Sequence, residues 1–114
     1  MDAGGGLKSG TPVRIRSMEW PELDALKERM RDFAERRNWD QFHAPKNLVM
    51  ALAGEAGELI EHFQWLTESE SARLEAGALA EVAAEIADIQ IYLARLSDKL
   101  GVSIADAVEK KIAE

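Results

Sequence analysis

The chain has 114 residues, of which 46% are hydrophobic, and it carries a formal net charge of −7 at pH 7. This length fits one domain with a modest core, to which oligomerisation would add buried surface. The acidic balance excludes a broad basic surface, so we expect no nucleic acid polymer as a partner. Because the chain has no cysteine, it has no disulfide and no thiolate zinc site, and its composition is compatible with the reducing cytoplasm in which we expect it.

The sequence shows neither a membrane anchor nor a secretory signal. No apolar run approaches the ~20 residues of a membrane span, so we expect no membrane partner. Residues 1–17 hold three consecutive glycines at 4–6 and a proline at position 12. We predict a flexible leader of the kind that an expression tag leaves, followed by one helical domain over 18–114.

Helical periodicity and capping signals predict the first two helices. The first is predicted over 18–38, with Ser17 as its N-cap and Pro21 in its first turn. Residues 39–44 interrupt the period, and Pro45 then begins a second helix that should continue to about Trp65. A polar connection is expected over 67–77.

Two further helices follow. The third is predicted over 79–100, where Gly101 in the C′ position stops it. Ser103 and Asp106 have the spacing of a capping box, with Asp in place of the usual Glu, and predict a fourth helix from Ile104 onward. No strand signal appears. The expected fold is therefore an all-α four-helix bundle, in which the second and third helices provide the functional site.

Two acidic pairs with i, i+3 spacing, Glu55 with Glu58 and Glu85 with Asp88, flank the apolar stripes of the second and third helices. At about 100° per residue, the first member of each pair lies within roughly 20–100° of the apolar side chains, and the second lies about 60° to the other side. The stripes consist of Leu48, Leu52, Leu59, Phe63 and Leu66 in one helix and Val82, Ile86, Ile89, Leu93, Leu96 and Leu100 in the other.

Carboxylates beside a buried stripe are partly desolvated, and ionised groups tolerate this only when paired or bound to a cation. Four oxygen ligands on two packed helices predict a hard-cation site for Mg²⁺ or Mn²⁺. The residues alone leave a second interpretation open, in which the acidic faces are solvated and belong to a metal-free helical interaction module. A ferritin-like oxidative site would require Glu-x-x-His motifs, which the sequence lacks.

Five stretches of sequence carry a resemblance to a known family. They are NWDQFH at 38–43, PKNL at 45–48, GEAGEL at 54–59, FQW at 63–65 and EIADIQIYL at 85–93. This ordered set closely resembles the MazG-like all-α nucleoside triphosphate pyrophosphohydrolases, and within them the dCTP pyrophosphatase branch. An acidic pair alone is common, whereas the set with its aromatic markers is specific.

The resemblance implies hydrolysis between the α and β phosphates of a nucleotide, giving the monophosphate and pyrophosphate, with Mg²⁺ held by Glu55, Glu58, Glu85 and Asp88. A triphosphate brings about four negative charges, which an acidic pocket accepts only through metal ions. One of the four carboxylates would take the proton of the attacking water, and we choose Glu58, although the sequence does not separate ligand from base. By analogy, such enzymes clear unwanted nucleotides from the pool.

Aromatic residues supply candidate contacts to the substrate. Trp39, Phe42 and Trp65 are predicted to cluster at the ends of the first two helices, where an aromatic face stacks on a base for ~1–3 kcal/mol. The resemblance places Trp39 and Trp65 in the base pocket, whereas the alternative is that they cap the core or line a subunit interface. Tyr92 is a candidate hydroxyl donor to a phosphate oxygen, although a lone Tyr is more often a core residue.

Polar candidates complete the predicted site. His43 is expected either to read a base edge or to hydrogen-bond the backbone of its own loop. Lys46, Asn47 and Lys111 resemble phosphate- and base-facing positions of the family, although isolated lysines are usually only solvated. His62 lies near the first acidic pair on the helical wheel, which makes it a candidate partner of the metal ligands.

The sequence departs from the family pattern at two points. The family continues past the fourth helix with an Asn and a basic tail that help to enclose the substrate, whereas this chain stops at Glu114. In the dCTP branch a His on the first helix contributes to base recognition, and Met30 stands there in this chain. We therefore expect dCTP or a related pyrimidine dNTP to be favoured, with purines also accepted. The family implies a homotetramer, or a dimer, in which Trp65 or the fourth helix completes a neighbouring subunit's pocket.

Overall fold

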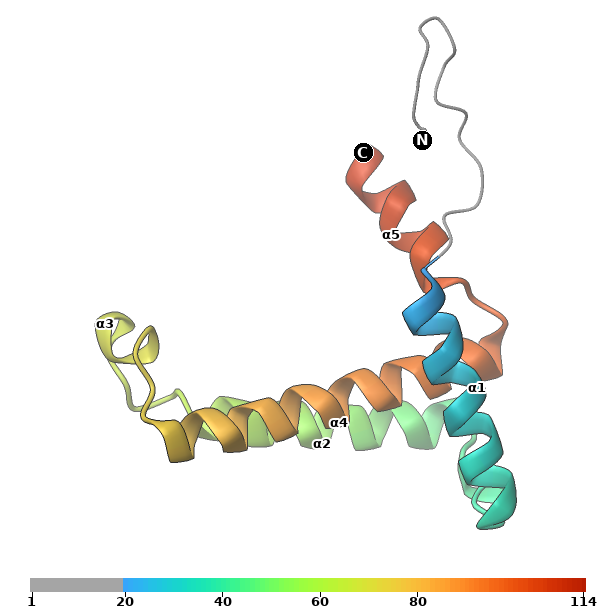
Figure 1. Cartoon of the computed structure of the whole chain (residues 1–114), viewed down its shortest axis with the longest axis horizontal. Helices are drawn as coiled ribbons and strands as arrows, with labels where there is room; N and C mark the ends of the chain where they lie inside the picture. The colour runs from blue at the N-terminus through green and yellow to red at the C-terminus, as the bar shows by residue number, and fades with distance from the viewer. Residues whose placement is uncertain (1–19) are drawn as a thin grey trace, which may run out of the picture.

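The computed structural model describes residues 20–114, and every regular element in this range is a helix (Figure 1). The elements are α1 (Pro21–Arg36), the 3₁₀-helix η1 (Asp40–Phe42), α2 (Pro45–Glu61), α3 (Glu68–Ser71), α4 (Ala76–Leu100) and α5 (Ile104–Ala113). The predicted all-α class and the four main helices are confirmed. None of the described helices has the length and hydropathy of a membrane span. The predicted leader, 1–17, lies outside the described residues.

The helix pair α2 and α4 forms the body of the molecule. The two helices lie side by side and run in opposite directions, and α1 crosses the end where α2 begins and α4 ends (Figure 1). α5 extends away from the pair. The radius of gyration is 18.1 Å, whereas a compact chain of this length would have about 13 Å. The arrangement is therefore open and leaves long faces of the helix pair uncovered by the described part of the chain.

α1 is shorter than predicted at both ends. It begins at Pro21, with Trp20 in the N-cap position, while the expected N-cap residue, Ser17, lies outside the described residues. Pro21 occupies the first turn as predicted, where a proline costs no hydrogen bond. After the last helical residue, Asn38 adopts a φ of 59°, a left-handed conformation that Asn tolerates better than most residues.

The second helix also ends earlier than predicted, at Glu61 instead of Trp65. Residues 62–66 continue as turns, and the connection to α4 contains the short helix α3, which the sequence analysis did not predict. A complete capping box explains this helix. Thr67 Oγ1 accepts from the Glu70 N–H at 3.1 Å, and Glu70 Oε1 accepts from the Thr67 N–H at 2.9 Å.

The junction between α4 and α5 follows the predicted capping signals, although α4 begins earlier than expected, at Ala76. Gly101 has a φ of 69°, its N–H donates to the Asp98 carbonyl at 3.3 Å, and the next N–H, of Val102, donates to the Ser97 carbonyl at 2.8 Å. These two bonds form a Schellman motif. Ser103 Oγ then accepts from the N–H of Asp106 at 3.1 Å and caps α5.

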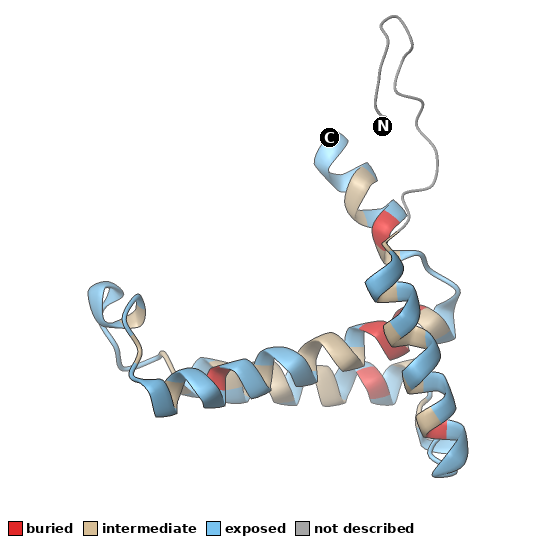
Figure 2. Cartoon of the chain, in the orientation of Figure 1, coloured by how far each residue is buried: buried red, intermediate tan, exposed pale blue. Residues whose placement is uncertain are grey.

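The core is small. Among the described residues, the fully buried hydrophobic side chains are Ala34, Leu48, Val82, Ala94 and Ala105, and they are scattered along the helices (Figure 2). Because these scattered side chains bury little apolar area, the helix pair gains only part of the free energy that burial of all its apolar side chains would contribute.

The predicted apolar stripe of α4 is only half correct. Val82 is buried and Ile89 and Leu96 are half-buried. A second column at seven-residue spacing is exposed, by 55% for Leu79, 56% for Ile86, 38% for Leu93 and 56% for Leu100. The reason is the width of the stripe, since the two columns lie about 60° apart around the helix and α2 covers only one of them.

Candidate metal centre and base-facing segment

Three carboxylates converge between α2 and α4. Glu55 and Glu58 lie one turn apart on α2, and Glu85 faces them from α4. One oxygen from each of the three lies within 4.8 Å of the other two. Glu55 and Glu85 are half-buried, whereas Glu58 is exposed. The antiparallel packing of the helix pair thus brings three of the four predicted metal ligands to one point.

Glu85 has the most perturbed acidity of this cluster. Desolvation, together with the facing carboxyl groups of Glu55 and Glu58, raises the pKa of Glu85 to about 7. Its Oε1 is buried and finds no hydrogen-bond partner within residues 20–114. An ionised oxygen in this position is stabilised by a cation, because no hydrogen bond from residues 20–114 offsets its lost hydration. The donor set therefore fits a hard divalent ion that prefers oxygen ligands.

His62 lies beside the cluster, as the helical wheel suggested. Its Nε2 is 3.8 Å from an oxygen of Glu85, and its Nδ1 is 3.7 Å from an oxygen of Glu81. Asp88, one turn beyond Glu85, is exposed and is not one of the three converging groups. Its role as a fourth ligand stays a prediction.

The aromatic candidates do not form one cluster. Trp39 and Phe42 precede the start of α2, whereas Trp65 follows its end. α2 has 17 residues, so it separates the two groups by about 25 Å at 1.5 Å per residue. The prediction of a single aromatic cluster within one chain is therefore wrong, because α2 is a continuous helix between them. Trp65 is 86% exposed.

Trp39 is already held in place by its neighbours. Its ring packs edge-on against Phe33, with centroids 5.2 Å apart, and Arg37 lies over the Phe33 ring at 3.8 Å. Trp39 remains 42% exposed. An aromatic side chain fixed on one side and open on the other can serve as a stacking platform.

The remaining substrate candidates occupy varied surroundings. Asn47 Nδ2 donates to the carbonyl of Phe42 at 3.3 Å, which ties the start of α2 to η1. Lys111, on the outlying α5, lies 3.4 Å from Glu114. Lys46 is exposed and Tyr92 is half-buried. The roles proposed for them toward substrate stay predictions.

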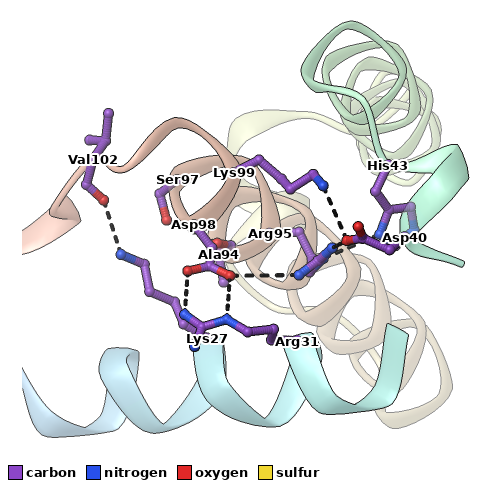
Figure 3. A network of polar contacts seen from close by, with 10 residues as sticks. All are labelled: Lys27, Arg31, Asp40, His43, Ala94, Arg95, Ser97, Asp98, Lys99 and Val102. Carbon is purple, nitrogen blue, oxygen red and sulfur yellow. Dashed lines mark hydrogen bonds and ion pairs between the residues drawn. The ribbon is translucent and has the colours of Figure 1, made fainter. Parts of the chain in front are cut away.

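Arg95, which was not among the predicted site residues, is the centre of a polar network (Figure 3). This α4 residue is only 1% exposed. Its Nη2 donates to Asp40 Oδ1 at 2.9 Å, its Nε donates to His43 Nδ1 at 3.2 Å, and its Nη1 lies 3.7 Å from Asp98 Oδ2. No helical signal marked it, since Arg95 lies seven residues after Asp88, on the same side of α4 as that exposed carboxylate.

The same network fastens α1 across the end of the helix pair. Arg31 donates to both oxygens of Asp98, at 3.0 and 2.6 Å, and Lys27 Nζ donates to the Val102 carbonyl at 3.0 Å. The hydrogen bond from Arg31 is the main reason that the pKa of Asp98 falls below its ordinary value. A bidentate guanidinium–carboxylate pair fixes orientation as well as distance.

The fold and the converging carboxylates together define this chain as an all-α protein with a candidate metal site between two helices. Residues 51–114 match the MazG-like family. The matched region contains both acidic pairs and all of α4 and α5. The chain therefore belongs to the MazG-like family, and the resemblance that its motifs indicated is confirmed.

Individual relatives agree with this assignment. The chain is 38% identical to dCTP pyrophosphatase 1 of Homo sapiens, over 95% of this chain and 65% of the relative. It is 39% identical to dCTP pyrophosphatase 1 of Mus musculus, over 81% of this chain and 55% of the relative. The chain thus spans little more than half of the length of one curated relative and 65% of the other. A solved pyrophosphatase structure from Archaeoglobus fulgidus matches with a TM-score of 0.76 and 33% identity, over 88% of this chain and 93% of that one.

Proposed function

We propose that this protein hydrolyses (deoxy)nucleoside triphosphates between the α and β phosphates, giving the monophosphate and pyrophosphate. The observation that carries this proposal is the convergence of Glu55, Glu58 and Glu85 within 4.8 Å. Membership of the MazG-like family and the similarity to dCTP pyrophosphatases support it. The cellular role that follows is removal of unwanted nucleotides from the cytoplasmic pool.

Mg²⁺ is the proposed ion, with Mn²⁺ as a substitute, because all the converging donors are carboxylate oxygens. Glu55, Glu58 and Glu85 would hold it, with Asp88 as the fourth ligand. When bound, the ion offsets the charge of the triphosphate, polarises the phosphoryl group and lowers the pKa of the attacking water.

Glu58 is the proposed general base. It is the exposed member of the cluster, so water reaches one of its carboxylate oxygens, while the other oxygen would hold the ion together with Glu55 and Glu85. Its carboxylate takes a proton from the attacking water as the water oxygen bonds to one of the two phosphorus atoms of the α–β linkage. The bond between that phosphorus and the bridging oxygen breaks, and the bridging oxygen keeps the electron pair, which releases pyrophosphate and the monophosphate.

A pyrimidine dNTP, dCTP or a relative, is the proposed substrate. Trp39 offers a partly exposed ring near His43, with centroids 6.2 Å apart, and a base stacks on such a ring without regard to its identity. Met30 on α1 supplies no hydrogen bond to a base edge. These two features support the acceptance of some purines, while the similarity to dCTP pyrophosphatases supports the proposed preference for pyrimidines.

Assembly into a homotetramer, or at least a dimer, is proposed on two grounds. The exposed column of α4, consisting of Leu79, Ile86, Leu93 and Leu100, leaves an apolar stripe with the seven-residue spacing that suits a partner helix. Trp65 lies about a helix length away from Trp39 in the same chain, so both contact one base only if a second subunit contributes one of them.

The test is release of pyrophosphate against phosphate from a panel of dNTPs and NTPs, with Mg²⁺ and with EDTA. The wild type is compared with Glu58→Gln and with Glu61→Gln, which changes an exposed carboxylate at the end of the same helix. Mg²⁺-dependent pyrophosphate release that Glu58→Gln lowers by about 10²-fold or more, and that Glu61→Gln retains, is the expected result.

A non-catalytic acidic helical interaction module is the second candidate. The open arrangement and the exposed faces of α2 and α4 favour it, since such faces also bind partner helices. Absence of hydrolysis of every nucleotide by folded, Mg²⁺-loaded protein would reject the enzyme and favour this module.

A further inference from the structure

Arg95 is a buried cation that donates hydrogen bonds to the segment next to Trp39. Two of its donors reach Asp40 and His43, at 2.9 and 3.2 Å, and both acceptors belong to or directly follow η1 (Figure 3). A buried guanidinium is expensive to desolvate and persists where its donors are satisfied. Its position far from the three converging glutamates along α4 indicates a role other than metal binding.

The contact with His43 fixes the protonation of the imidazole. A guanidinium only donates hydrogen bonds, so His43 Nδ1 must accept the one from Arg95 Nε. A neutral imidazole that accepts at Nδ1 carries its proton at Nε2. We propose that Arg95 is a positioning residue that holds His43 as the neutral Nε2–H tautomer, so that His43 presents a hydrogen-bond donor to the nucleobase.

The charges around His43 keep the ring neutral. Desolvation, Arg95 and Lys99 lower the pKa of His43, whereas Asp40 raises it, and the net direction is downward. Lys99 Nζ also donates to Asp40 Oδ1 at 3.1 Å, so the carboxylate that raises the pKa of His43 is shared between two cations of α4. Its ability to stabilise an imidazolium is thereby reduced.

The other nitrogen of the ring is left without a hydrogen bond in the described part of the chain. This nitrogen is Nε2, and the side chain is half-buried. Its ring is tilted by 60° to that of Trp39. A stacked base on Trp39 would therefore have an N–H donor close to its edge.

The position of this donor indicates which bases it would favour. That inference rests on the proposed hydrolysis of nucleotides. A donor selects an acceptor, such as the 2-carbonyl oxygen that cytosine, uracil and thymine share. It does not select the exocyclic amino group that distinguishes cytosine. His43 held in this way would favour pyrimidines over adenine, because the acceptors of adenine are ring nitrogens, which lie closer to the centre of the base than a carbonyl oxygen does and so leave a longer gap to the donor.

The direct test is long-range ¹H–¹⁵N NMR of the imidazoles in the nucleotide-free protein near neutral pH. The chain has two histidines, and His43→Gln assigns the spectrum. The expected wild-type result is a neutral His43 with the Nε2–H tautomer. An Nδ1–H tautomer or an imidazolium at that pH would overturn the proposal.

Three variants separate positioning from general damage. Arg95→Met should give a mixture of tautomers and raise the pKa of His43, Arg95→Lys should restore the wild-type state in part, and Lys99→Met should leave the tautomer unchanged. A folded Arg95→Met protein with an unchanged His43 spectrum would overturn the proposal. Where Arg95→Met fails to fold, the wild-type and Arg95→Lys spectra decide.

Steady-state kinetics then test whether His43 donates a hydrogen bond to the nucleobase. His43→Phe should raise KM for pyrimidine dNTPs by about three- to tenfold, the worth of one neutral hydrogen bond, with kcat nearly unchanged and KM for dATP unaffected. Equal effects on all bases, or none, would overturn the base-reading role. Absence of hydrolysis in the wild type together with the Nε2–H tautomer would reject the proposed function while supporting the positioning role of Arg95.

Discussion

Glu58 of α2 and Glu85 of α4 place carboxylate oxygens within 4.8 Å of each other across the helix pair. At that distance, ionisation of one carboxyl group raises the free energy of the ionised form of the other, unless a cation lies between them. Desolvation and this repulsion together raise the pKa of Glu85 to about 7. The same repulsion makes the cluster a strong candidate for metal binding.

The pKa of Glu85 predicts how the stability of EDTA-treated protein depends on pH. Because the pKa in the folded state lies above the ordinary 4.5, the folded state binds the proton more tightly than the unfolded state does. The associated stability is present below about pH 4.5 and is lost as pH rises through about 7. Urea unfolding of wild type and Glu85→Gln should therefore show the wild type losing stability relative to the variant over this window. Parallel profiles for the two proteins would contradict the prediction.

The Arg31–Asp98 pair predicts a stability difference with the opposite pH dependence. The pKa of Asp98 is lowered in the folded state, so its contribution is present above the ordinary Asp pKa and is lost as pH falls through the lowered value. Arg31→Met should be less stable than wild type near neutral pH, and the difference should shrink in acid. Arg29→Met, which changes an exposed arginine of the same helix, serves as the control and should show no such convergence.

The Schellman motif predicts opposite effects for two Gly→Ala substitutions. A Cβ has open space at both Gly101 and Gly77, so neither change creates a clash. Gly101 has a φ of 69°, and alanine there should cost about 1–2 kcal/mol. Gly77 lies in the first turn of α4, where alanine should be neutral or stabilise by up to about 1 kcal/mol. Thermal unfolding of both variants measures the contrast, and equal losses would argue against the left-handed cap.

The exposed column of α4 predicts the effect of added charge on assembly. Leu79→Glu combined with Leu93→Glu should shift the protein toward monomer, because each change buries a carboxylate in the proposed interface. Ala84→Glu, at an exposed position about 140° around the helix from Leu79, should leave the assembly intact. Light scattering on wild type and both variants gives the comparison. A wild type that is already monomeric at micromolar concentration would reject the interface.

Local sequence signals predicted the helices well, because capping depends on neighbouring residues. Pro45, Gly101 and Ser103 mark helix ends where the structure has them. The i, i+3 spacing of Glu55 and Glu58 placed both on one face of α2, which is why three of the four predicted ligands converge. These inferences required only helical geometry and the packing of two apolar stripes.

Features that depend on which partner covers a face were not predictable from periodicity. Leu93 and Leu100 belong to the same broad stripe as Leu96, yet α2 covers only one side of it. Arg95 looked like any charged helix residue, although it is buried because Asp40, distant in sequence, reaches it. The separation of Trp39 from Trp65, by contrast, was already implied by the predicted unbroken helix from Pro45 to about Trp65, which places the two rings at opposite ends.

The central claim is that the carboxylates between α2 and α4 hold a divalent cation. Calorimetric titration of Mg²⁺ and Mn²⁺ into wild type, the double variant Glu55→Gln with Glu58→Gln, and Glu61→Gln tests it most directly. Binding by wild type and Glu61→Gln that the double variant loses is the predicted result. Undiminished Mg²⁺ binding by the folded double variant would contradict the account.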